Sequence, residues 1–274
     1  MPPVFEAADN RLIQPRNSLQ EVVRHRTFLL YWVWRNISAR YRQTTLGPIW
    51  ALLLPLLSGV VYAFVFGVFL GLQTGGVPYA VFAITNLVLW TYATRTILTG
   101  PAALLGNLDL ITRVRFPREM FPLSVWLESL TDLALGAVVV AIFFVYYQVP
   151  VTRYMLLAPI VFLVYSTFVL GVAFITAAIS VTVRDLIHVM PVVLQLLLYL
   201  APVIYPVSIV PEGYRSLYLA NPLAVVFAAF EETLFLGRFT LGAELAVSAA
   251  VSVAVLTVGY RLFKQQEWRI ADLL

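Results

Sequence analysis

Three charged residues lie inside apolar stretches of the sequence, and they are the first candidates for chemistry. Glu128 and Asp132 are four positions apart, so on a helix they would share one face. Arg95 lies in an earlier apolar stretch. If these stretches cross a membrane, each charge costs about 2.5–3.5 kcal/mol and normally faces a cavity or another charge. Two hypotheses follow. The acids line a conduit or relay protons, or they form an ion network with Arg95 that holds two helices together.

Other signatures of catalysis or nucleotide binding are missing from the sequence. The only lysine, Lys264, stands in no Gly-x-x-x-x-Gly-Lys-Ser/Thr string, and no Gly-x-Ser-x-Gly or His-Glu-x-x-His string occurs. There is no cysteine, and the two histidines, His25 and His188, lie far apart. We therefore expect no catalytic residue, no metal site and no cofactor bound by this chain. If the protein uses ATP, another chain must bind it.

The elements that position these residues are membrane helices. Between Arg42 and Arg95 the chain runs for 52 residues without a formal charge, and a helix needs about 20 apolar residues to cross a bilayer. Glycines and a proline between Gly71 and Pro78 mark a turn in the middle of this run. The composition agrees, with 61% hydrophobic residues, 12% charged residues and a mean hydropathy of +0.88.

We predict an all-α integral membrane fold with six transmembrane helices. Residues 207–238 are apolar but contain the breaking pair Asn221-Pro222 and the costly pair Glu231-Glu232. They predict re-entrant half-helices before the last span, not a seventh span. The predicted spans are 47–71, 78–104, 120–147, 154–182, 189–206 and 240–262.

The basic residues predict the orientation. With six crossings, fourteen of the 18 basic residues fall on one side, three fall on the other, and Arg95 lies near or inside the membrane. This bias predicts that both termini are cytoplasmic. The net charge of +4 is thus explained by topology, and it does not indicate a nucleic-acid partner.

An amphipathic helix that does not span is predicted before the first crossing, over residues 18–42. Its apolar positions recur with helical spacing, while a second face carries polar residues. Such a helix lies along the membrane interface, or it serves only as a topology anchor. The apolar face holds Val22, Leu29, Leu30, Val33 and Ile37, and the polar face holds Arg24, Tyr31, Arg35, Ser38 and Arg42.

Several short motifs occur in a characteristic order along the chain. They are Leu46-Gly-Pro-Ile-Trp50, Asn107-Leu-Asp-Leu-Ile111, Val114-Arg-Phe-Pro-Arg118, Val183-Arg-Asp185, Ser-Ile-Val-Pro211, Asn221-Pro222-Leu and Glu267-Trp-Arg-Ile-Ala-Asp272. In this order and spacing the chain resembles the permease subunit of ABC-2 type exporters for cell-surface polysaccharide. It is most similar to O-antigen transport permeases, followed by teichoic acid permeases. One departure is Arg115, where the family pattern has an aromatic residue.

The resemblance implies a division of the chain and a set of partners. Residues 1–45 would form the cytoplasmic N-terminus with the interface helix, and residues 46–274 the ABC-2 transmembrane domain. Two copies would pair with two ATP-binding subunits, which hold ATP and Mg²⁺. The substrate would be a polysaccharide linked to undecaprenyl diphosphate, exported across the bacterial inner membrane. The half-helices before the last span would belong to an outer gate.

Three groups of residues are candidates for roles in such a machine. Cations at headgroup depth suit a pyrophosphate-bearing lipid, although topology and anionic lipids also explain them. Aromatic rings suit pyranose faces, although packing also explains them. Candidates for the substrate entrance are Arg35, Arg40, Arg42, Arg113, Arg115 and Arg118. Candidates for the path are Tyr62, Phe66, Phe69, Trp90, Tyr92, Tyr199 and Tyr205. Candidates for contact with the ATPase subunit are Asp109, Arg184 and Asp185.

Other functions stay open at this point. An ABC-2 permease for teichoic acid, a drug or another lipid would share the same pattern. A membrane-embedded transferase acting on polyprenyl-linked sugars would be active as a single chain and would need Glu128 or Asp132. A secondary transporter would show inverted internal repeats, which the sequence does not display.

Overall fold

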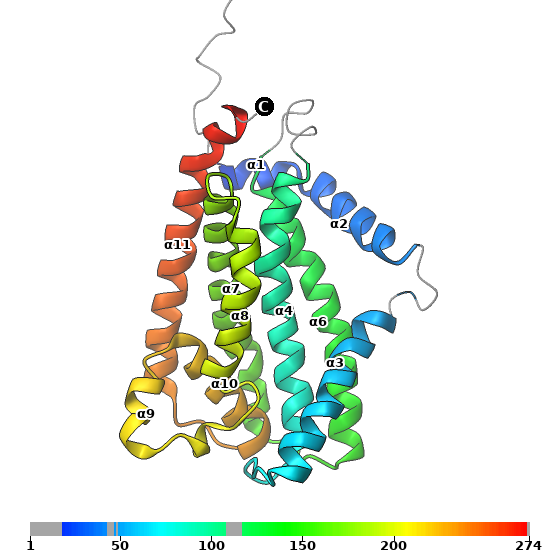
Figure 1. Cartoon of the computed structure of the whole chain (residues 1–274), viewed down its shortest axis with the longest axis vertical. Helices are drawn as coiled ribbons and strands as arrows, with labels where there is room; N and C mark the ends of the chain where they lie inside the picture. The colour runs from blue at the N-terminus through cyan, green and yellow to red at the C-terminus, as the bar shows by residue number, and fades with distance from the viewer. Residues whose placement is uncertain (1–17, 43–46, 48, 108–116, 273–274) are drawn as a thin grey trace, which may run out of the picture.

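The computed structural model describes residues 18–42, 47, 49–107 and 117–272, and the regular elements of these segments are all helical. Figure 1 shows long helices running side by side, with short helices at both ends of the bundle. One end, which we call the α1 end, holds α1 (Ser18–Arg24) and the last turns of α11 (Gly242–Asp272). The opposite end, the α9 end, holds α9 (Glu212–Tyr218).

Five helices of the described chain are long and apolar enough to cross a membrane. Length and hydropathy decide this, because about 20 apolar residues cover the hydrocarbon core. The all-helical membrane fold expected from the sequence is therefore confirmed. The five are α3 with η2 (Ile49–Tyr62 and Ala63–Phe69), α4 (Tyr79–Leu105), α6 (Met120–Tyr146), η3 with α7 (Arg153–Leu157 and Ala158–Ser180), and α11.

Helix α8 (Leu186–Leu200) differs from the span predicted at 189–206. It has 15 residues, which corresponds to about 22 Å of helix. Pro202 explains the early end, because a proline disfavours helical backbone at the residue before it. Ala201 accordingly has the extended angles φ −111° and ψ 153°. The chain then continues without a regular helix as far as η4 (Val207–Ile209), on the way to the α9 end.

The segment before α11 forms two short helices instead of one span. Helix α9 and the unit of α10 (Pro222–Glu231) and η5 (Glu232–Leu236) meet at a bend of 113°. Asn221 begins α10 by accepting a hydrogen bond from the Leu223 amide at 3.0 Å. Gly237, with φ +59°, then ends η5 and lets the chain turn towards α11. This arrangement agrees with the predicted re-entrant half-helices.

Helix α4 lies at the centre of the bundle and α3 at its periphery. Within their membrane windows 78% of the α4 residues are buried, against 11% for α3. Aromatic side chains from other helices pack on α4, including Phe227 of α10, whose ring centroid lies 6.3 Å from that of Trp90. The face of α3 that points away from the bundle is apolar and is available to lipid or to another chain.

Helices α7 and α11 approach so closely that only glycine fits between them. A Cβ added to Gly171 would lie 2.6 Å from the Leu256 nitrogen, and one added to Gly259 would lie 2.4 Å from the Gly171 oxygen. Membrane helices use small residues in this way, because dispersion contacts replace the hydrophobic effect as the driving force. This pair of glycines therefore fixes α11 against the bundle.

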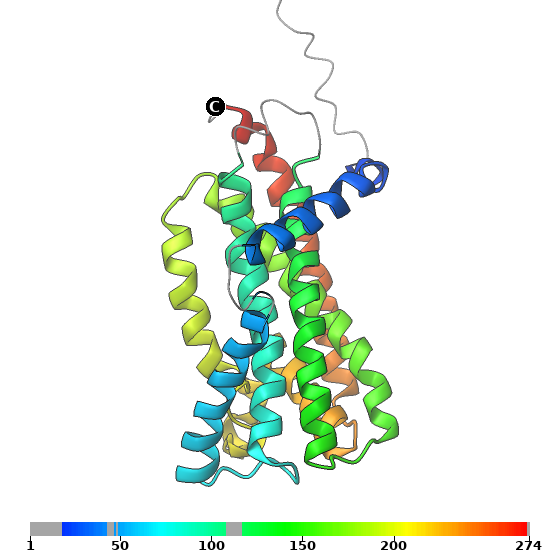
Figure 2. The ribbon, with the colours of Figure 1, turned by 90° about the vertical axis from the view of Figure 1, so that its right-hand side faces the viewer.

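Helix α2 (Arg26–Tyr41) lies across the bundle near its α1 end, as Figure 2 shows from the side. Its residues Leu29 and Val33 pack on Met120 at the start of α6. Trp32 meets Phe121 edge to face, with ring centroids 5.9 Å apart. Of the predicted apolar face, Leu29 and Val33 are buried and Leu30 is exposed, while Trp32, which was not assigned to that face, is also buried.

Candidate functional site

The two carboxylates of α6 form a network with arginine. Arg95 of α4 makes an ion pair with Asp132 and approaches Glu128, with Nη2 4.0 Å from Oε2. Glu128 is only 4% exposed and Asp132 13% exposed. Helix α6 presents both acids on one face, as their spacing predicts, and α4 supplies a cation that reaches both. Helices α4 and α6 are therefore joined by charge as well as by packing.

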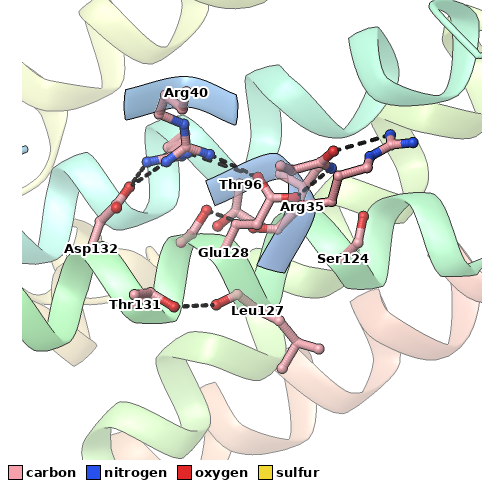
Figure 3. Close-up of polar contacts among 12 residues, drawn as sticks. Arg35, Arg40, Thr96, Ser124, Leu127, Glu128, Thr131 and Asp132 are labelled. Atoms are coloured by element: carbon pink, nitrogen blue, oxygen red, sulfur yellow. Dashed lines mark hydrogen bonds and ion pairs between the residues drawn. The ribbon is translucent and has the colours of Figure 1, made fainter. Parts of the chain in front are cut away.

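The network also includes two residues from the N-terminal helix. Arg40 of α2 places Nη2 2.7 Å from Glu128 Oε2 and Nη1 3.4 Å from Asp132 Oδ2. Asn36 donates a hydrogen bond to Glu128 Oε1 at 2.8 Å. Figure 3 shows Arg40 reaching from α2 towards both acids of α6. Thus α2, α4 and α6 meet at one cluster, which we call the ion network: Asn36, Arg40, Arg95, Glu128 and Asp132.

The charges of the ion network balance, with two guanidinium groups facing two carboxylates. A buried charge is tolerated when it is paired and hydrogen-bonded, whereas removal of one partner leaves an uncompensated charge. The geometry therefore favours the second sequence hypothesis, a structural network that docks helices. It adds a third helix, α2, which the sequence did not reveal. Arg40, predicted at the substrate entrance, is paired here and partly buried.

Two other entrance candidates of α2 lie on a different face. Arg35 and Arg42 line a shallow cavity of about 390 Å³ with Tyr31, Trp34 and Ser38. This set contains four of the five polar-face residues predicted from the sequence. The guanidinium of Arg35 stacks on the Trp32 ring at 3.6 Å and donates to Asn36 Oδ1 at 3.3 Å. Arg42 is exposed. We call this surface the α2 groove.

The remaining entrance and ATPase candidates are only partly described. Arg118 lies just before α6 and is partly exposed. Arg184 and Asp185 are exposed in the turn between α7 and α8, at the α1 end of the bundle. Three further candidates lie outside the described residues: Asp109, Arg113 and Arg115.

The aromatic path candidates separate into surface and core residues. Trp90 and Tyr92 are buried, and the Tyr92 hydroxyl lies 2.7 Å from Ser166 Oγ. Both side chains belong to the core of this chain, and their place on a transport path stays a prediction. Large apolar and aromatic side chains are buried in this way because they fill the space between helices.

The other aromatic candidates lie along α3 and η2 and around α8, and Tyr62 and Phe66 pack partly buried against the core. Tyr62 and Phe66 contact each other edge to face, with centroids 5.9 Å apart, and Phe69 is 70% exposed. Tyr199 is half exposed, and its carbonyl accepts a hydrogen bond from the Tyr205 hydroxyl at 2.7 Å. These five residues border the half of the bundle nearest the α9 end.

A cavity of about 780 Å³ lies on another face of α3, between η2, the first turn of α4 and α6. Its walls are mostly apolar, and Phe64, Val68, Tyr79 and Phe143 are among them. None of the aromatic path candidates lines it. Helix α3 therefore presents two distinct surfaces, an aromatic stripe and the wall of this cavity.

A second ion cluster lies at the α1 end and was not predicted. Glu119, just before α6, is fully buried, and Lys264 of α11 places Nζ 2.9 Å from its Oε2. The Tyr260 hydroxyl donates to Glu119 Oε1 at 3.4 Å. The single lysine of the chain is thus held by α6, and the cluster joins the last helix to the third span. A lone lysine in an otherwise arginine-rich chain was the only sequence signal.

Comparisons with known proteins agree with one another. Residues 27–235 match the family described as ABC-2 type transporter. The O-antigen export system permease protein RfbA of Myxococcus xanthus is 32% identical over 256 residues, covering 93% of this chain and 98% of that protein. RfbA of Klebsiella pneumoniae is 27% identical over 242 residues, covering 88% and 92% of the two chains. The polysialic acid transport protein KpsM of Escherichia coli is 22% identical over 237 residues, covering 85% and 91%.

Proposed function

Because the chain belongs to the ABC-2 type transporter family, we propose that it is the permease subunit of an ATP-driven exporter of cell-surface polysaccharide. The substrate is an O-antigen-like polymer linked to undecaprenyl diphosphate. The protein moves this polymer across the bacterial inner membrane, and both termini are cytoplasmic. The α1 end of the bundle then faces the cytoplasm, and the α9 end faces outwards.

The observation that carries this proposal is the end-to-end similarity to an O-antigen export permease. The alignment covers 93% of this chain and 98% of that relative, so the likeness is not confined to one domain. The shared order of motifs along the whole chain supports the same conclusion. A relative named for polysialic acid transport extends the similarity to a second polymer.

The energy source lies on a separate polypeptide in this proposal. The chain contains one lysine, and Lys264 is held in an ion pair with Glu119, so it is not part of a phosphate-binding loop. Two ATP-binding subunits, with ATP and Mg²⁺, would dock at the α1 end. The exposed turn of Arg184 and Asp185 supports this site, and Asp109 belongs to the same predicted contact.

The substrate headgroup enters near the α2 groove. A diphosphate needs cations at headgroup depth, and Arg35 and Arg42 border one open surface there. Arg113, Arg115 and Arg118 are the further candidates for this entrance. Arg40 has a different task in this proposal, because its guanidinium is committed to Glu128 and Asp132.

The polymer passes between two copies of the permease. The centre of one chain is filled, because α4 is largely buried and carries Trp90 and Tyr92 into the core. A path as wide as a sugar chain therefore fits better along α3 and η2, where Phe69 is exposed and Tyr62 and Phe66 are partly buried. Tyr199 and Tyr205 continue this aromatic border around α8.

Deletion of the gene in its host tests the proposal. We expect loss of the surface polysaccharide, accumulation of the lipid-linked polymer inside the cell, and rescue by the intact gene. Undiminished surface polysaccharide would remove the proposed function and leave a permease for another lipid or a drug. In vesicles, transport should require the ATP-binding subunit. Transport without it, or transferase activity of the purified chain alone, would contradict the division of labour.

A further inference from the structure

A charged cavity lies at the α9 end, away from the ion network and the α2 groove. It has a volume of about 360 Å³, within the usual range of about 300–1,000 Å³ for small-molecule sites. Five separate parts of the chain form its wall: the η2–α4 turn at Gly75, the α8–α9 connection, α9, the α10–η5 unit and the turn before α11. Its polar lining consists of Ser208, Arg215, Glu231, Glu232, Arg238 and Thr240. We call it the outer pocket.

One of the two adjacent glutamates is structural. Glu232 is 6% exposed, and its carboxylate accepts hydrogen bonds from the Thr240 amide at 2.6 Å and from the Thr240 hydroxyl. Arg238 adds an ion pair, with Nε 3.4 Å from Glu232 Oε1. These contacts hold the turn after η5 against the half-helix, so Glu232 and Arg238 form a rigid side of the pocket.

The other glutamate keeps an oxygen without a partner. Glu231 is 5% exposed, and its Oε2 accepts a hydrogen bond from the Val207 amide at 3.2 Å. Its Oε1 forms no hydrogen bond or ion pair with any residue that the structure describes. Because Glu231 lines the cavity, this oxygen can accept a hydrogen bond from a ligand that binds there.

A guanidinium on the same wall also lacks a partner. Arg215 of α9 makes no ion pair or side-chain hydrogen bond within the described residues, and its Nε is buried without one. Although Arg215 and Glu231 carry opposite charges and line one cavity, they are not within 4.0 Å of each other. The pocket therefore holds one unmatched acceptor and one unmatched set of donors.

From this geometry we propose that the outer pocket binds one sugar residue of the chain that leaves the permease. A hydroxyl group both donates and accepts hydrogen bonds. The hydroxyl groups of one sugar ring can therefore donate to Glu231 Oε1 and accept from the guanidinium of Arg215. The four charges of the lining cancel, which disfavours a simple anion or cation as the ligand. This inference rests on the proposed function, and it adds a sugar subsite beside the re-entrant half-helices.

Binding of a defined oligosaccharide tests the proposal. The probe is the repeat-unit oligosaccharide released from the host's own surface polysaccharide. Binding to the full-length permease, purified with its ATP-binding subunit, is measured by saturation-transfer NMR and calorimetry. We expect Glu231→Gln and Arg215→Gln each to weaken binding by about tenfold, the equivalent of one charge-assisted hydrogen bond. Arg215 has no contact to lose, so its variant folds even if the Glu231 variant does not.

Two matched variants at the same end of the bundle serve as controls. Glu212→Gln and Arg153→Gln remove the same charges from exposed positions outside the pocket lining, and their affinity should equal that of the wild type. Equal binding by the wild type and Arg215→Gln overturns the subsite. If deletion shows that export depends on the gene but the purified wild-type complex does not bind the oligosaccharide, the subsite is also overturned. If deletion leaves the surface polysaccharide intact, the proposed function fails first, and the subsite fails with it.

Discussion

The ion network and the outer pocket use the same residue types in opposite ways. In the ion network two arginines and two carboxylates from three helices are paired, and Asn36 donates a further hydrogen bond to Glu128. In the outer pocket Glu231 and Arg215 face one cavity without pairing. Since an unpaired buried charge is costly, the pairing pattern distinguishes charges that stabilise the fold from charges that are available to bind a ligand.

The largest effect is expected from breaking the ion network. Glu128→Leu leaves Arg40 and Arg95 with Asp132 as their single carboxylate in the ion network and Asn36 without its acceptor. The free energy of unfolding should fall by about 3 kcal/mol, the lower end of the range for a broken buried pair, because both arginines are partly exposed. Thermal unfolding in lipid nanodiscs measures this, and Trp32 fluorescence reports whether α2 detaches from α6.

A charge swap gives the control for the network. Arg40→Glu combined with Glu128→Arg should recover part of the stability that each single substitution loses. If Glu128→Leu unfolds at the wild-type temperature, the network carries no docking energy. The contrast with the outer pocket would then disappear.

A smaller effect is expected at the second ion cluster. Glu119→Gln keeps the shape of the side chain but removes the charge that Lys264 and Tyr260 share. We expect a loss of about 2 kcal/mol, the value of a charged hydrogen bond, measured by thermal unfolding. The matched control is Glu244→Gln on the exposed side of α11, which should change nothing. Equal stability of the two variants would show that the Glu119 cluster does not hold α11 in place.

Within α2 the same contrast can be made between neighbouring arginines. Arg40 is paired with α6, whereas Arg42 is exposed and borders the α2 groove. Arg42→Gln should leave stability unchanged and lower the export rate by about 2- to 5-fold, because an exposed ion pair is worth less than about 1 kcal/mol. Export is measured as surface polysaccharide after induction. If Arg42→Gln lowers stability as much as Arg40→Gln does, both residues are structural and the entrance proposal loses its support.

Local patterns in the sequence predicted much of the fold and part of the ion network. The spacing of Glu128 and Asp132 predicted a shared helix face, and Arg95 was the only cation in an earlier apolar stretch. Asn221-Pro222 predicted the break before the half-helix because an asparagine cap and a proline in the first turn begin helices. The polar face of residues 18–42 likewise predicted the lining of the α2 groove.

The rest depends on contacts between distant parts of the chain, on which a periodic pattern carries no information. Arg40 meets Glu128 across 88 positions, and Glu119 meets Lys264 across 145. The approach of Gly171 to Gly259 is of the same kind. Trp90 and Tyr92 were assigned to the path because aromatic residues suit sugars, yet the same residues are the largest fillers of a helical core. The structure adds that α4 is largely buried, which the types of these two residues could not reveal.

The smallest effect on stability is expected at Arg215 in the outer pocket. Because a paired charge, Glu232, lines the same pocket, the two residues can be compared directly. Arg215 has no partner among the described residues, so Arg215→Gln should change the free energy of unfolding by no more than about 0.5 kcal/mol. Glu232→Gln in the same pocket should be destabilising, because Thr240 and Arg238 lose a charged acceptor. Unfolding temperatures of the two variants, measured without sugar, test this difference. A loss at Arg215 equal to that at Glu232 would mean that both charges belong to the fold, and the pocket would then have no unmatched group to offer a ligand.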